Sequence, residues 1–154
     1  TGIAGDGVMS VFGGTGPVDD VPATCRAALA AAAAIWDGVE ALSAELRHEL
    51  DAPLRIGIGV HLGPSVVGTT GVTAPRPIQF LGDTGNVAAR LEEATRSQQC
   101  LALVSEALVG RAGAEGGEAC RELLSGFTDP QEIALRGRAE RLLARSFGAD
   151  ARSA

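Results

Sequence analysis

Apolar side chains recur every three or four residues between positions 23 and 50, which is the spacing of one face of an α-helix. Charged residues fall outside that face, and Asp51-Ala52-Pro53 ends the pattern. The chain therefore predicts one long amphipathic helix over 23–50. Its apolar positions are Leu29, Ala32, Trp36, Val39, Leu42 and Leu46.

A second pattern alternates residue by residue over 54–61, as in a β-strand. Ile56, Ile58 and Val60 share one face, and the opposite face carries Gly57 and Gly59. A strand face without side chains lets another part of the chain lie close to the backbone. We therefore expect a close neighbour on the glycine face.

Short apolar segments separated by turn residues predict several hairpins, which argues against an all-parallel sheet. The expected fold is α+β, with helices packed on a mostly antiparallel sheet. One domain over 1–147 would be followed by a frayed tail over 148–154. Ser105 is expected to cap a helix that begins at Glu106. The other expected elements are a hairpin over 3–12, a turn with a returning strand over 63–68, a strand over 78–81, a helix over 86–96, a strand over 100–104 and a hairpin over 133–147, with a loop over 113–117.

Composition narrows the class of protein. The 154 residues are 45% hydrophobic with a net charge of −6, so the chain is globular and lacks the basic character of nucleic-acid-binding proteins. Three widely spaced cysteines indicate buried, reduced thiols of a cytoplasmic protein. The longest apolar run, Ala27–Trp36, is too short to span a bilayer, so no membrane segment is expected. The abrupt start without Met suggests a piece of a longer protein.

Two short motifs carry candidate chemistry. Asp6 stands at a hairpin tip, where its carboxylate could hold Mg²⁺, although Gly-Asp-Gly is also common turn chemistry. After Gly82, a helix begins with Asp83 or Thr84 as the cap. Asn86 and Arg90 then share a face at the edge of an apolar stripe made by Val87, Leu91 and Ala94. The alternative is a solvated Asn86 and an Arg90 that pairs with Glu92 or Glu93.

In order and spacing, these segments resemble the catalytic domain of class III adenylate and guanylate cyclases. The resemblance rests on GDGVMSVFG (5–13), LRIGIGVHLG (54–63), GDTGNVAARLE (82–92) and LRGR (135–138). It implies a ferredoxin-like cyclase fold, a head-to-tail homodimer, and conversion of ATP to 3′,5′-cyclic AMP and pyrophosphate with Mg²⁺ or Mn²⁺. Asp6 would then be a metal ligand, Asn86 would orient the ribose, and Arg90 would stabilise the transition state. Arg136 stands where the family has a lysine for the terminal phosphates.

Several positions depart from the family pattern. The family's first strand, with its second metal aspartate, lies upstream of this chain, so the isolated chain is expected to have little or no activity. The two base-selecting positions fall on Gly2 and Gln79, which match neither the adenine nor the guanine pattern, and a Gln amide can pair with either purine. A guanylate cyclase, or a nucleotide-binding regulatory module without turnover, therefore stays an alternative. Regulatory domains are expected upstream or downstream. We assign no catalytic role to His48 or His61.

Overall fold

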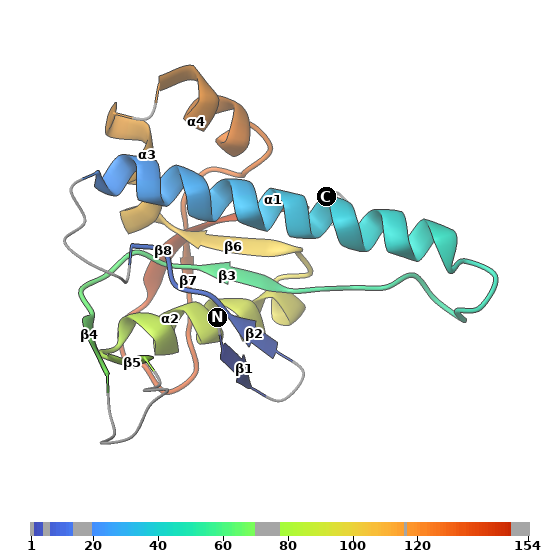
Figure 1. The fold of residues 1–154 in the computed structure, drawn as a ribbon, viewed down its shortest axis with the longest axis horizontal. Helices are drawn as coiled ribbons and strands as arrows, with labels where there is room; N and C mark the ends of the chain where they lie inside the picture. The colour runs from blue at the N-terminus through green and yellow to red at the C-terminus, as the bar shows by residue number, and fades with distance from the viewer. Residues whose placement is uncertain (1, 5–6, 14–19, 70–77, 116, 149–154) are drawn as a thin grey trace.

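The computed structural model describes residues 2–4, 7–13, 20–69, 78–115 and 117–148 (Figure 1). The helices are α1 (Val21–Glu45), α2 (Thr84–Ser97), α3 (Glu106–Glu115) and α4 (Gly117–Leu124). The strands are β1 (Gly2–Ala4), β2 (Gly7–Met9), β3 (Ile58–Val60), β4 (Val66–Thr69), β5 (Ile78–Leu81), β6 (Ala102–Ser105), β7 (Gln131–Ile133) and β8 (Leu142–Phe147). The hairpin tip predicted at Gly5-Asp6 lies outside the described residues, and so does the tail predicted over 148–154 except for Gly148.

A four-stranded sheet in the order β3-β6-β8-β7 forms the centre of the domain. The β3–β6 pair is parallel, and the pairs β6–β8 and β7–β8 are antiparallel. Two separate hairpins, β1–β2 and β4–β5, lie beside it. Helix α1 covers one face of the sheet together with α3 and α4, and α2 covers the other face (Figure 1). The predicted α+β class with a mostly antiparallel sheet is therefore confirmed.

Each face of the sheet has its own core cluster. One cluster joins α1, α3 and α4 to the sheet and includes Cys25, Leu29, Val104 and Cys120. The other lies under α2 and contains Val87, Leu91, Leu103, Ile133 and Leu135. The three cysteines are free and buried, as the sequence predicted.

The two glycines of the 54–61 segment explain how α2 approaches the sheet. A Cβ atom on Gly59 would overlap the carbonyl oxygen of Ala88 and the amide nitrogen of Glu92, both in the backbone of α2. A Cβ atom on Gly57 would overlap the hydroxyl of Thr95. The expected close neighbour on the glycine face is thus α2, although the regular strand itself covers only β3.

Helix α1 begins two residues before its predicted start, where the Asp20 carboxylate accepts a hydrogen bond from the amide of Ala23 at 2.7 Å. It ends at Glu45, and residues 46–49 form turns. Among the described residues, α1 is long and apolar enough to cross a membrane by length and composition alone. Its first turns nevertheless pack into the core through Cys25 and Leu29.

Two local predictions are wrong. Ser105 does not cap α3, because it is the last residue of β6 and its buried hydroxyl has no hydrogen-bond partner among the described residues. Helix α3 therefore follows the strand directly. The predicted loop over 113–117 is mostly helical, since α3 continues to Glu115 and α4 begins at Gly117.

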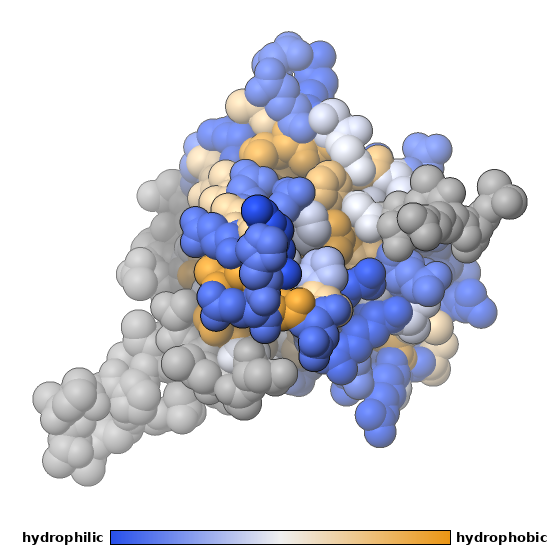
Figure 2. All heavy atoms as spheres, turned by 90° about the vertical axis from the view of Figure 1, so that its right-hand side faces the viewer, coloured by the Kyte–Doolittle hydropathy of each residue, from blue (hydrophilic) through white to orange (hydrophobic). Residues whose placement is uncertain are grey.

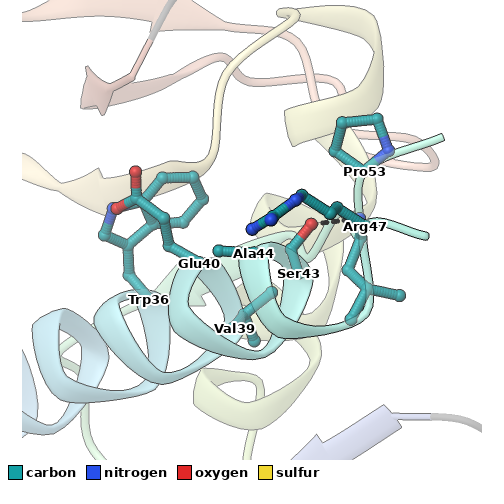
Figure 3. Close-up of a pocket in the computed structure, with 8 residues that line it drawn as sticks. Trp36, Val39, Glu40, Ser43, Ala44, Arg47 and Pro53 are labelled. Carbon is teal, nitrogen blue, oxygen red and sulfur yellow. Dashed lines mark hydrogen bonds between the residues drawn. The ribbon is translucent and has the colours of Figure 1, made fainter. Parts of the chain in front are cut away.

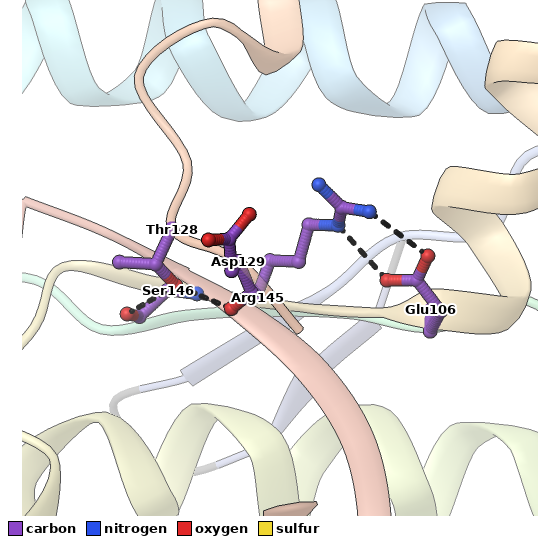
Figure 4. Close-up of polar contacts among 5 residues, drawn as sticks. All are labelled: Glu106, Thr128, Asp129, Arg145 and Ser146. Atoms are coloured by element: carbon purple, nitrogen blue, oxygen red, sulfur yellow. Dashed lines mark hydrogen bonds and ion pairs between the residues drawn. The ribbon is translucent and has the colours of Figure 1, made fainter. Parts of the chain in front are cut away.

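One ion pair joins the last strand to the helix layer. Arg145 of β8 donates to Glu106, the first residue of α3, with Nε–Oε2 and Nη2–Oε1 distances of 2.9 and 3.0 Å (Figure 4). Both side chains are less than one-third exposed. The hydrogen bond to Glu106 raises the pKa of the Arg145 guanidinium. This two-point contact fixes β8 relative to α3.

Candidate active site

Helix α2 presents the two central candidate residues on one side. Val87 and Leu91 are buried against the sheet, while Asn86 is exposed and Arg90 is half-buried. The i and i+4 positions place Asn86 and Arg90 at the border of the buried stripe. No described carboxylate forms an ion pair with Arg90, and Glu93 pairs with Arg136. The alternative of an Arg90–Glu93 or Arg90–Glu92 pair is therefore not found.

The turn between β7 and β8 lies against this helix. Arg136 Nη1 lies 3.7 Å from Glu93 Oε1. Gly137 has a φ of +73°, and a Cβ atom placed on it would lie 3.7 Å from Arg90 Nη2. The structure thus brings the predicted phosphate-side residue Arg136 next to the α2 face that carries Arg90.

The first residues of α2 do not cap the helix with their side chains. Asp83 occupies the N-cap position but makes no side-chain cap bond, and its carboxylate accepts a hydrogen bond from Arg138 instead. The Thr84 hydroxyl donates to the carbonyl of Pro64 at 2.7 Å. The predicted cap position of Asp83 is confirmed, but its side chain makes no cap bond, because the side chains of both Asp83 and Thr84 bind neighbouring segments.

The N-terminal hairpin reaches the same end of α2. A Cβ atom on Gly85 would lie 3.5 Å from the sulfur of Met9. Met9 pairs with Gly2 across the hairpin, so the backbone of Gly2 lies in the strand beside it. In the other hairpin, Gln79 pairs with Gly68. Gln79 lies four residues before Asp83 in the chain. Gly2 and Gln79 therefore belong to two short hairpins. The β1–β2 hairpin approaches the first turn of α2 through Met9, and β5 precedes α2 directly in the chain.

A metal centre is not seen in the described part of the chain. No group of three or more His, Cys, Asp or Glu side chains there could hold a metal ion. The predicted ligand Asp6 lies outside the described residues. The described side chains alone do not form a site for two metal ions. No reaction step is therefore assigned to a metal ion.

His61 was assigned no role from the sequence, and it lies close to the start of α2. Its Nε2 and the hydroxyl of Thr84 would lie 3.2 and 2.6 Å from a Cβ atom on Gly63. Its Nδ1 is buried and has no hydrogen-bond partner among the described residues. Burial, and then the charge of Arg138, lower the pKa of His61, while Asp83 opposes them. The imidazole is therefore neutral at neutral pH.

A pocket of about 400 Å³ lies elsewhere, at the far end of α1 (Figure 3). Figure 2 views the molecule from this side, where hydrophobic patches lie between hydrophilic residues on the surface. Trp36, Val39, Ala44, Pro53 and Leu54 supply most of its apolar lining, and none of the predicted site residues contributes. Since α1 and α2 cover opposite faces of the sheet, this pocket is separate from the α2 site.

The sequence missed the pairing of Asp83 with Arg138. The available signal was the pair of arginines in Leu135-Arg136-Gly137-Arg138, since an arginine can pair with a carboxylate. Nothing in the linear pattern indicates which carboxylate, because the partners are 55 residues apart.

Known proteins that are similar in sequence to this chain include guanylyl cyclases. Rat retinal guanylyl cyclase 2 (Rattus norvegicus) is 35% identical over 96 residues, which is 62% of this chain and 7% of that protein. Human retinal guanylyl cyclase 1 (Homo sapiens) is 51% identical over 47 residues, which is 30% of this chain and 4% of that protein. The chain thus spans a small part of the length of these relatives.

The likeness extends to a solved structure, the adenylyl cyclase CyaB from P. aeruginosa. It superposes with a TM-score of 0.62 over 93% of this chain and 67% of that chain, at 19% identity. At this identity the superposition establishes the fold. Residues 2–141 also match the family model of the adenylate and guanylate cyclase catalytic domain, so the chain belongs to this family of class III nucleotidyl cyclases.

Proposed function

We propose that the domain converts ATP to 3′,5′-cyclic AMP and pyrophosphate. The ribose O3′ attacks the α-phosphorus, so an O3′–P bond forms, the bond to the β-phosphate oxygen breaks, and the hydroxyl proton is lost. The observation that carries this proposal is the shared α2 face of Asn86 and Arg90, with the Arg136 turn beside it. The superposed adenylyl cyclase supports ATP as the substrate.

Each candidate residue suits a different part of the nucleotide. Arg90 supplies a planar, permanently charged group for the charge that develops on the reacting phosphate. Asn86, one turn earlier, orients the ribose through its amide. Arg136 is 87% exposed and can leave Glu93 to bind the terminal phosphates. Gly2 and Gln79 occupy the base-selecting positions.

Family members typically use a divalent metal ion. We propose Asp6 as a ligand for Mg²⁺ or Mn²⁺, which would supply Lewis acidity at the phosphates. A second copy of the domain, arranged head to tail, would complete the site. Exposed apolar side chains on or near the two flanking hairpins suit such a contact. They are Val8, Val11, Phe12 and Val66.

The test incubates the full encoded protein with ATP or GTP, with Mg²⁺ or Mn²⁺, and measures cyclic nucleotide and pyrophosphate by mass spectrometry. The expected result is cyclic AMP in equal amount to pyrophosphate, at a rate per molecule that rises with protein concentration. Absence of both cyclic nucleotides would refute the proposal.

A second candidate is guanylate cyclase activity, which the names of the curated relatives favour. A higher kcat/KM for GTP than for ATP in the same assay would establish it. The remaining candidate is a regulatory module that binds nucleotide without turnover. Calorimetry that shows tight nucleotide binding by a protein without turnover would favour this reading.

A further inference from the structure

The β7–β8 turn contacts α2 through three consecutive residues. Arg136 pairs with Glu93, Arg138 pairs with Asp83, and between them a Cβ atom on Gly137 would lie 3.7 Å from Nη2 of Arg90. The turn therefore follows α2 from its third turn back to its N-cap. Leu135, immediately before the turn, is buried in the same cluster as Val87 and Leu91 and anchors one end of this contact.

Two ion pairs join the turn to α2, Asp83–Arg138 and Glu93–Arg136. Arg138 is only 32% exposed, whereas Arg136 is 87% exposed. Asp83 stands at the N-cap of α2, where its carboxylate could accept a backbone hydrogen bond, but it makes no such bond. Exposed ion pairs contribute little free energy, so Arg136–Glu93 holds the turn weakly, and Arg138 is its main polar anchor.

We propose that Arg138 and Asp83 are positioning residues, which hold the Gly137 turn against Arg90 and thereby fix the guanidinium beside Asn86. Neither residue contacts the nucleotide in this proposal, which rests on the proposed function. The guanidinium of Arg90 has no described carboxylate partner, so in this proposal the neighbouring turn limits its movement. Loss of the anchor would misplace a group whose effect depends on orientation.

The activity test uses the full encoded protein with Asp83→Asn, Arg138→Met, the double variant and Arg138→Lys. Each single variant should lower kcat by about tenfold, because misplacement of a catalytic group reduces the rate more than binding. KM should stay near the wild-type value. The double variant should lose no more than either single variant, and Arg138→Lys should recover part of kcat. Arg121→Met, which removes an exposed ion pair on α4, is the matched control and should keep wild-type kinetics.

Three results would overturn the proposal. They are a wild-type kcat in the single variants, a kcat loss in the double variant equal to the product of the two single losses, and a rise in KM without a change in kcat. A second measurement needs no turnover. Side-chain NMR relaxation at Arg90 Nε in the 154-residue chain should show greater mobility in Arg138→Met than in Arg121→Met. Equal mobility would refute the positioning role even if the wild-type protein is inactive, whereas an inactive wild type with mobilised Arg90 would refute the proposed function alone.

Discussion

At the residue scale, the guanidinium of Arg90 lies 3.7 Å from where a Cβ atom on Gly137 would be, and it has no carboxylate partner among the described side chains. Its charge is therefore available to an incoming anion. An arginine that already paired with Glu93 would first have to break that contact. The half-buried position also restricts its rotamers, which favours a fixed orientation.

This arrangement predicts the effect of Arg90→Lys. Lysine keeps the charge but loses the planar fork, so kcat should fall by about 100-fold, as for loss of one transition-state donor. KM should change less. The measurement is steady-state cyclase kinetics, and Arg96→Lys, two turns later on α2, is the control. Equal kinetics for Arg90→Lys and wild type would exclude Arg90 from the transition state.

His61 predicts a pH dependence of stability. Burial lowers its pKa in the folded protein below the ordinary value of 6.5, so the unfolded chain binds its proton at higher pH. The contribution of neutral His61 to the free energy of unfolding should therefore be fully present above about pH 6.5. It should decrease as the pH falls from this value toward the lower pKa of the folded protein. Urea unfolding between pH 7.5 and 5.5 measures the slope.

The variant His61→Gln should show a smaller slope over the same range. His48→Gln, which changes an exposed histidine after α1, is the comparison. If both variants keep the wild-type slope, His61 is not the group responsible.

At the element scale, the approach of α2 to β3 depends on a strand face without side chains. Gly59 has backbone atoms of α2 where a Cβ atom would lie. Backbone cannot rotate away as a flexible side chain can, so any larger residue must push the helix off the sheet. The same contact fixes the height of Asn86 and Arg90 above the sheet.

Gly59→Ala should therefore reduce the free energy of unfolding by about 1–3 kcal/mol or more through overpacking. Gly113→Ala in α3 is the matched control, since its Cβ atom would meet nothing within 4 Å. That change should stabilise the protein by about 0.5–1 kcal/mol, because alanine favours the helix. Denaturant unfolding measures both, and a neutral Gly59→Ala would contradict the tight packing described here.

Periodicity predicted α1, α2 and the glycine face of β3 because these features depend on neighbours a few residues away. The missing cap at Ser105 and the continuous helix over 113–115 could not be predicted in this way, since the sheet and the helix layer determine them. The same limit applies to the site. The face shared by Asn86 and Arg90 follows from helical spacing, whereas the support from Gly137 and Arg138 depends on a chain reversal far along the sequence.

At the scale of the whole molecule, the two helix layers are joined through the sheet, and the two-point Arg145–Glu106 ion pair links β8 to α3. Arg145→Met should lower the free energy of unfolding by about 1–3 kcal/mol, because Glu106 keeps a partly buried charge without its partner. Arg121→Met removes the ion pair with Glu118, whose two side chains are 72% and 78% exposed. This variant should change the free energy of unfolding by less than about 0.5 kcal/mol. Thermal and denaturant unfolding measure the difference, and equal effects would contradict this ranking.

The position of β8 in the sheet has a consequence for biosynthesis. β8 is the last described strand in the chain, yet it lies between β6 and β7. While a ribosome is still adding residues before Leu142, β6 exposes an unpaired edge and β7 has no partner in the sheet, and such edges favour aggregation. The sheet therefore closes late in translation, and only then can the turn before β8 dock on α2. A nascent chain must therefore extend through β8 before the α2 face proposed for catalysis is complete.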